Sequence, residues 1–179
     1  MHLVNLTVLF ALNKNIPIIR REKFSGEIIK VSNCSLTLFS SGKIIATGKH
    51  SYEKKIELVT ALLKDRNFEG EIESSKIINI VFTSQITLAT SWSEATKLSC
   101  FTYEPELFPS CIWRRGNAII SLFTSGKYII TGVQSTSAAY KTEQDFFEGN
   151  FLPSLRLYKA AYFHPLDHLF LCFYVNYVS

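Results

Sequence analysis

The chain has 179 residues, of which 47% are hydrophobic and 19% charged, and its formal net charge is +4. This length suits one domain or two small lobes sharing one sheet, and the apolar fraction is enough for a core. The modest positive charge permits contact with nucleic acid but does not argue for it, because many basic domains bind none.

The first part of the chain consists of short apolar segments typical of strands. Residues 3–12 predict an opening strand, because no basic segment precedes them and no small-residue cleavage site follows, as a signal peptide would require. Residues 13–23 are short and basic, with room for one helical turn or two at most. Residues 26–31 and 35–39 are β-branched and alternating, which predicts two more strands.

A helix is predicted next. Ser51 is a suitable N-cap, and the negative charge of Glu53 in the first turn is stabilised by the positive end of the helix dipole. Five apolar residues then follow the helical period and predict one buried face, namely Tyr52, Ile56, Val59, Leu62 and Leu63. We expect this helix to lie on the sheet and to end near Asn67.

The second part of the chain repeats this order of elements. Residues 76–83 predict a strand, and a short helix is expected within 91–98. Residues 112–115 and 118–123 predict two strands around a turn. Residues 135–148 are expected to form a second long helix, although their apolar pattern is only partial.

The two parts match each other directly. Residues 38–48, LFSSGKIIATG, return as residues 122–132, LFTSGKYIITG, with eight of eleven positions identical at a constant offset of 84. Phe24 and Phe108 are related by the same offset, and residues 3–6 match residues 77–80 at an offset of 74. Such self-similarity indicates two copies of one structural unit, each ending in a Ser-Gly hairpin.

The second copy also carries the segment YEPELFP, residues 103–109. Together with the two hairpins and the two strand-borne asparagines, it resembles the core domain of the TATA-binding protein family over residues 3–159. The resemblance implies an α+β fold: a saddle of two pseudo-symmetric repeats with one curved antiparallel sheet and helices on its convex face. We expect the first repeat, shortened, at 1–74, the second at 75–159, and a C-terminal extension at 160–179.

Strand alternation predicts which side chains line the concave face. Ile45 and Thr47 share one side of their strand, as do Ile129 and Thr131, whereas the opposite side faces the helices with Ile44, Ala46, Tyr128 and Ile130. In the resemblance it is the concave set that contacts DNA. The minor-groove edge of A·T pairs offers only acceptors, so readers need small donors in an otherwise apolar surface.

The resemblance implies three kinds of DNA contact. The donors are Asn5, Asn79, Thr47 and Thr131, and the apolar surface comes from Ile45, Ile129 and Val81. Apolar wedges that kink the duplex are two phenylalanine pairs, Phe24 with Phe39 and Phe108 with Phe123. Phosphate contacts, which position the protein without specifying sequence, are Lys43, Lys127, Arg114 and Arg115.

The implied function is that of a general transcription initiation factor. It binds the minor groove of TATA or A·T-rich promoter DNA in the nucleus, kinks it, and recruits transcription factors IIA and IIB, other initiation factors and the RNA polymerase machinery. Glu104, Glu106 and Leu107 resemble the segment of the family that binds transcription factor IIB.

An alternative is a diverged paralogue that acts mainly as a protein-interaction scaffold with weak TATA affinity. Thr7, Thr37 and Ser121 favour it, because they stand where the family prefers apolar groove residues. Leu9 stands where the family prefers a small polar residue, and the helix at 51–66 is mixed in charge where the family's is basic.

The sequence predicts no enzyme, cofactor, metal or membrane span. No nucleophile–base pair, glycine-rich phosphate loop or paired carboxylate site stands out. The four cysteines form no CxxC pair, and Pro165 separates His164 from His168 with no third ligand near. The apolar run within residues 160–179 is about ten residues long, whereas a bilayer span takes about 20.

Overall fold

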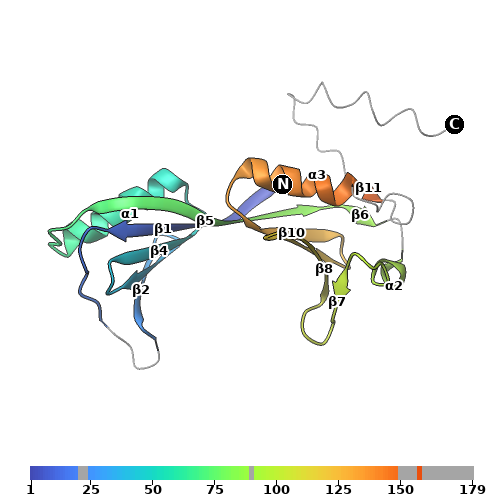
Figure 1. The fold of residues 1–179 in the computed structure, drawn as a ribbon, viewed down its shortest axis with the longest axis horizontal. Coiled ribbons are helices and arrows are strands. Elements are labelled where there is room, and N and C mark those ends of the chain that lie inside the picture. Colours follow the sequence, from blue (N-terminus) through green and yellow to red (C-terminus); the bar gives the residue numbers. More distant parts are fainter. Residues whose placement is uncertain (20–23, 89–90, 149–156, 159–179) are drawn as a thin grey trace, which may run out of the picture.

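The computed structural model describes residues 1–19, 24–88, 91–148 and 157–158, and these form one large sheet with helices on one side (Figure 1). The sheet has nine antiparallel strands in the order β2-β3-β4-β1-β5-β10-β9-β8-β7. These strands are β1 (His2–Leu12), β2 (Gly26–Val31), β3 (Cys34–Phe39), β4 (Lys43–Gly48), β5 (Ile72–Gln85), β7 (Thr102–Tyr103), β8 (Ser110–Arg115), β9 (Ala118–Phe123) and β10 (Lys127–Val133).

Three helices and a small second sheet complete the described structure. The helices are α1 (Tyr52–Asp65), α2 (Trp92–Ala95) and α3 (Thr136–Glu148), and β6 (Thr87–Leu88) pairs with β11 (Leu157–Tyr158). Within the described residues, none of these helices has both the length and the apolar character needed to cross a membrane. The predicted extension at 160–179 lies outside the described residues.

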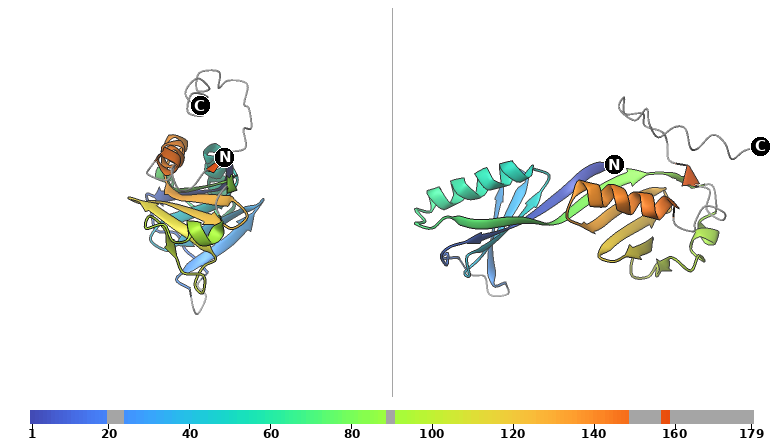
Figure 2. Two further views of the ribbon diagram at one scale, coloured as in Figure 1. Left: turned by 90° about the vertical axis from the view of Figure 1, so that its right-hand side faces the viewer. Right: turned by 45° about the horizontal axis from the view of Figure 1, so that its top comes forward.

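The strand order is nearly the same read from either side of the central β1–β5 pair. β4, β3 and β2 follow on one side, and β10, β9 and β8 follow on the other, with β7 beyond β8. The sheet is curved like an arch, and α1 and α3 lie over its convex side (Figures 1 and 2). The outer strands of each half form the two sides of the arch. This is the α+β saddle with one curved antiparallel sheet that the sequence predicts.

The core lies between the sheet and the helices. Ile44, Ala46, Tyr128 and Ile130 are fully buried, as strand alternation predicts for the helix-facing side. On β1 the buried residues alternate in the same way, with Leu6, Val8, Phe10 and Leu12 inside. Their neighbours on the other side of each strand are only half-buried, so the concave face of the saddle is left open.

The hairpin predictions are confirmed. The β3–β4 turn contains Gly42 with φ 79°, and the β9–β10 turn contains Gly126 with φ 77°. The expected turn of helix within residues 13–23 does not appear in residues 13–19, where the backbone is irregular, and residues 20–23 lie outside the described part.

The helix α1 forms as predicted, and it also buries a lysine that the apolar pattern omits. The Ser51 Oγ accepts a hydrogen bond from the Lys54 backbone N–H, at 3.2 Å, and caps the helix. Val59 and Leu63 are buried against the sheet. Lys55 is fully buried beside them, and its Nζ donates to the Gly48 carbonyl at 3.1 Å. Burial lowers the pKa of Lys55.

The helix α3 also forms as predicted, despite its partial apolar stripe. Aromatic packing compensates, because the fully buried Phe146 ring lies 5.6 Å from Trp113 and 6.3 Å from Tyr128, centroid to centroid. The Tyr128 hydroxyl donates to the Glu143 carboxylate, which ties β10 to the helix. Burial, followed by this hydrogen bond, raises the pKa of Tyr128.

Candidate nucleic-acid interface

Two asparagines at the centre of the concave face make equivalent hydrogen bonds. The Gly48 N–H donates to Asn5 Oδ1 at 2.7 Å, and the Gly132 N–H donates to Asn79 Oδ1 at 3.0 Å. Each bond orients its carboxamide and engages the acceptor oxygen. Among the described residues no hydrogen bond uses either side-chain NH₂ group, so both remain available as donors.

The strand register gathers the other predicted reader residues around these asparagines. Across the β1–β5 pair, Asn5 lies opposite Val81 and Asn79 lies opposite Thr7. The neighbouring strands β4 and β10 present the repeated set on the same face, where the half-buried residues are Ile45, Thr47, Ile129 and Thr131. The centre of the concave face therefore combines three apolar side chains with five small polar ones.

The four phenylalanines form two pairs, one in each half. The Phe24 and Phe39 rings lie 6.3 Å apart with an interplanar angle of 61°, and the Phe108 and Phe123 rings lie 5.8 Å apart at 70°. Phe24 is 38% exposed and Phe108 45%. Each exposed ring packs edge-on against a half-buried one at the end of a hairpin, so each half presents an apolar projection to solvent.

The predicted phosphate contacts differ in their surroundings. Lys43 and Lys127 are exposed at the starts of β4 and β10. Arg114 is exposed on the groove side of β8, opposite the half-buried Ile119. Arg115 is the next residue and points to the helix side, where its Nη1 lies 3.2 Å from Asp145 Oδ1 of α3.

Sequence reasoning missed the cation that corresponds to Arg114. Lys30 stands 84 residues before Arg114 and is exposed on β2, opposite the half-buried Ser35. The offset that relates the two hairpins could have found it. The two halves therefore each carry one exposed cation at the same place on their outer strands.

The three residues of the expected partner site lie together in the loop between β7 and β8. The backbone N–H groups of Leu107 and Phe108 both donate to the Glu104 carbonyl, at 3.0 and 2.9 Å. Glu104 and Glu106 are exposed, and Leu107 is 80% exposed. This compact turn holds two acidic groups and an apolar side chain in solvent, next to Phe108.

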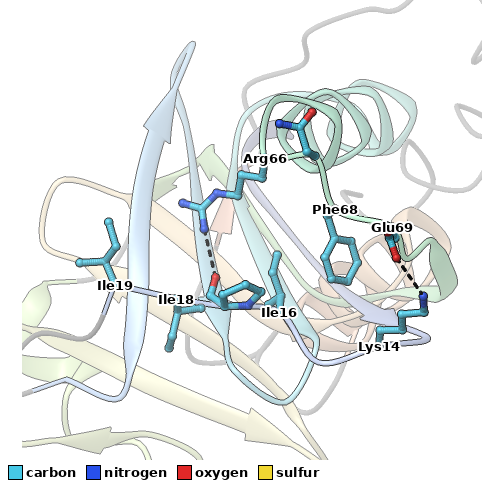
Figure 3. A pocket seen from close by; sticks show the side chains of 9 residues that line it. Lys14, Ile16, Ile18, Ile19, Arg66, Phe68 and Glu69 are labelled. Atoms are coloured by element: carbon cyan, nitrogen blue, oxygen red, sulfur yellow. Dashed lines mark hydrogen bonds and ion pairs between the residues drawn. The ribbon is translucent and has the colours of Figure 1, made fainter.

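A hollow of about 520 Å³ lies beside the C-terminal end of α1, away from these residues (Figure 3). Its apolar wall includes Ile16, Ile18 and Phe68, and its rim carries Lys14 paired with Glu69 at 4.0 Å. Among the described residues, no three of His, Cys, Asp and Glu gather where they could hold a metal ion. His164 and His168 lie outside the described part of the chain.

The fold and the duplicated concave face define a class: a two-repeat saddle protein with one open sheet face. The sequence model of the family described as "Transcription factor TFIID (or TATA-binding protein, TBP)" matches residues 74–148. The TATA-box-binding protein of Methanococcus vannielii is 30% identical over 127 residues, covering 66% of this chain and 70% of the relative. The chain belongs to the TATA-box-binding protein family.

Further relatives extend the match. The TATA-box-binding protein of Sulfolobus acidocaldarius is 28% identical over 151 residues, covering 78% of this chain and 77% of the relative. The structure of Methanococcus jannaschii TBP superposes with a TM-score of 0.68 at 25% identity, over 81% of this chain and 94% of the other. The family is one of non-enzymatic general transcription factors that act on DNA, so a DNA-associated role follows for this chain.

Proposed function

We propose that this protein is a general transcription initiation factor that binds the minor groove of TATA or A·T-rich promoter DNA. The observation that carries the proposal is the repeated bond from a glycine N–H to an asparagine Oδ1, which leaves two oriented NH₂ donors at the centre of the concave face. The minor-groove edges of A·T pairs carry acceptors only, so oriented donors match them. The half-buried Ile45, Val81 and Ile129 around them suit contact with a widened groove.

The two phenylalanine pairs act as wedges in this proposal. Each half exposes one phenylalanine against a supporting partner ring, and the repetition of this apolar projection in both halves supports a shared role. Insertion of such a wedge into a base step partly unstacks it and kinks the duplex. With one pair in each half, Phe24–Phe39 and Phe108–Phe123, the kinks fall at the two ends of the bound site.

Phosphate contacts come from exposed cations on the groove side of the sheet. Lys43, Lys127 and Arg114 are exposed there, and Lys30 joins them as the counterpart of Arg114. Arg115 faces α3 and pairs with Asp145, so its phosphate contact needs that ion pair to open. These contacts hold the protein on the duplex and carry no sequence information.

The protein then recruits transcription factors IIA and IIB, other initiation factors and the RNA polymerase machinery. The exposed turn with Glu104, Glu106 and Leu107 is the proposed contact for transcription factor IIB, since it presents an apolar side chain together with two carboxylates. Residues 1–74 and 75–159 act as the two repeats and residues 160–179 as an extension. The role implies a DNA-associated compartment, and we propose the nucleus.

Binding and bending of a TATA duplex labelled at both ends, read by fluorescence transfer, test the proposal. We expect tight binding with a bend, and loss of the bend in Phe39→Ala and in Phe123→Ala. Tyr140→Ala is the matched control, because Tyr140 is 55% exposed on α3 and should leave the bend unchanged.

Each outcome of this experiment has a distinct meaning. Loss of the bend only in Phe123→Ala would restrict the wedge to the second half. Absence of a bend, together with equal affinity for a G·C duplex, would overturn the proposal and leave the scaffold with weak TATA affinity, which Thr7, Thr37 and Ser121 favour. Strong salt dependence is expected for true phosphate contact and would count against that scaffold.

A further inference from the structure

The concave face departs from two-fold symmetry at one central pair of positions. The offset of 74 that relates Asn5 to Asn79 also relates Thr7 to Val81. The next readers outward are identical in the two halves, Ile45 with Ile129 and Thr47 with Thr131. Thr7 and Val81 have nearly the same shape, but only Thr7 carries a hydroxyl. The centre of the face is therefore symmetric in shape and asymmetric in hydrogen bonding.

The β1–β5 register puts this difference beside the asparagines. Asn5 lies opposite Val81, and Thr7 lies opposite Asn79. The first pair places an amide beside an apolar isopropyl group, and the second places a hydroxyl beside an amide. All four side chains are half-buried on the open side of the sheet. A ligand on this face therefore meets Thr7 on one side of the centre and Val81 at the equivalent place on the other.

The next related pair, Leu9 and Thr83, differs in shape but adds little asymmetry in available hydrogen-bonding groups. The Thr83 Oγ1 donates to the Tyr128 carbonyl at 3.2 Å, so its hydroxyl is already satisfied by backbone. In the part of the chain that the structure describes, no hydrogen bond uses the Thr7 hydroxyl. Along the two central strands, Thr7 thus offers a hydroxyl that remains available to a ligand.

A hydroxyl at this position changes which base pair can be tolerated. In the minor groove a G·C pair differs from A·T by the guanine N2 amino group, which is a donor. Pressed against Val81, that donor would be buried without a partner, and such burial is unfavourable. The asparagines offer NH₂ donors, and their oxygens already accept from glycine N–H groups. The Thr7 hydroxyl can instead accept from the guanine amino group.

We propose that Thr7 lets this protein accept a G·C pair at one of the two central base pairs of its site, while Val81 enforces A·T at the other. The inference rests on the minor-groove function proposed above and refines its specificity. The strand order of the two halves is nearly symmetric, so this proposal includes binding in both orientations, one of which places a single central G·C pair under Thr7. Two central G·C pairs cannot both be placed there, because one of them then lies under Val81.

Competition binding with three duplexes tests this inference. They carry an all-A·T site, the same site with one central G·C pair, and the same site with both central pairs changed to G·C. We expect wild type to bind the first two within about two-fold and the third about ten-fold more weakly, the usual scale for one mismatched base pair. Thr7→Val should lose about ten-fold already with one G·C pair, and Val81→Thr should tolerate both.

Thr60→Val is the matched control. It removes the same hydroxyl from the exposed side of α1, away from the concave face, so the three-duplex pattern should stay that of wild type. Equal discrimination by wild type and Thr7→Val against one central G·C pair, with A·T preference intact, would overturn the inference alone. Absence of any preference for the all-A·T duplex over a fully G·C duplex would overturn the proposed function, and the inference with it.

Discussion

Glu27 on β2 joins this strand to the end of α1 and to the segment that follows β1. Its carboxylate accepts two hydrogen bonds from the Arg66 guanidinium, at 2.5 and 3.0 Å, and a third from the Ile19 backbone N–H at 3.1 Å. Arg66 also donates to the Pro17 carbonyl, at the edge of the hollow in Figure 3. The Glu27 side chain is 12% exposed and the Arg66 side chain is 26% exposed. The Arg66 hydrogen bond, opposed by burial, holds the pKa of Glu27 below its usual value.

Glu27→Gln is expected to lower the free energy of unfolding by about 1–2 kcal/mol at pH 7, because a charge-assisted pair becomes a neutral one. A carboxyl with a lowered folded pKa contributes stability above its unfolded value near 4.5, and loses it as the pH falls through the folded pKa. The difference between variant and wild type should therefore shrink below about pH 4.5. Urea unfolding at pH 7 and at lower pH measures it.

The matched control is Glu57→Gln on α1. Glu57 pairs with Lys54 at 2.7 Å, but both side chains are more than half exposed. Its removal should change the free energy of unfolding by less than about 0.5 kcal/mol at either pH. Equal effects of the two substitutions would show that the Glu27 pair is no stronger than a surface pair.

The β10 strand depends on a glycine near its end. Gly132 has φ 75°, and its N–H orients the Asn79 carboxamide. A Cβ added there would lie 1.9 Å from the Asn117 carbonyl oxygen. Gly116, in the turn between β8 and β9, also has a positive φ, 58°, but a Cβ there would meet nothing within 4 Å. Substitution of each glycine by alanine therefore distinguishes the effect of a positive φ, common to both, from the effect of a steric clash, which occurs only at Gly132.

Gly116→Ala should lower the free energy of unfolding by about 1 kcal/mol, the usual effect of a left-handed conformation in an L-residue. Gly132→Ala should lower it by about 3 kcal/mol, because the clash forces the end of β10 away from β9. Chemical denaturation of both variants measures the difference. Equal losses would mean that the backbone around Asn117 yields at little energetic cost.

The saddle as a whole separates its charges by face. The exposed cations Lys30, Lys43, Arg114 and Lys127 lie toward the concave side or its rims. On the convex side, several of the charges of α1 are neutralised within the protein, since Lys54 pairs with Glu57 and Arg66 with Glu27. The four cations of the open side take part in no ion pair among the described residues.

Binding of an A·T-rich duplex should weaken as salt rises, because each phosphate contact releases counterions. The double variant Lys43→Ala/Lys127→Ala should reduce the slope of log K against log salt by about 2, roughly one for each lost contact. Lys64→Ala, on the exposed side of α1, should leave the slope unchanged. An unaltered slope in the double variant would mean that both lysines remain solvated in the complex.

The two-repeat organisation and the side of each strand that faces solvent follow from the sequence alone. The offset of 84 and the two Ser-Gly turns are properties of the chain, so the hairpins and their two-fold relation can be found without coordinates. Strand alternation likewise assigns Ile44 and Tyr128 to the core and leaves Ile45 and Ile129 on the other side, because a strand has a fixed period of two.

Which polar groups already have a partner within the protein can be seen only in the folded structure. The Asn5 and Asn79 side-chain oxygens accept hydrogen bonds from glycines 43 and 53 residues away. Lys55 is buried on the sheet side of α1 and donates to Gly48, and Arg115 pairs with Asp145 on α3. These partners come from strands and helices that meet only in the folded chain. Local pattern fixes the face on which a side chain lies, whereas its hydrogen-bond partner depends on which distant segment packs beside it.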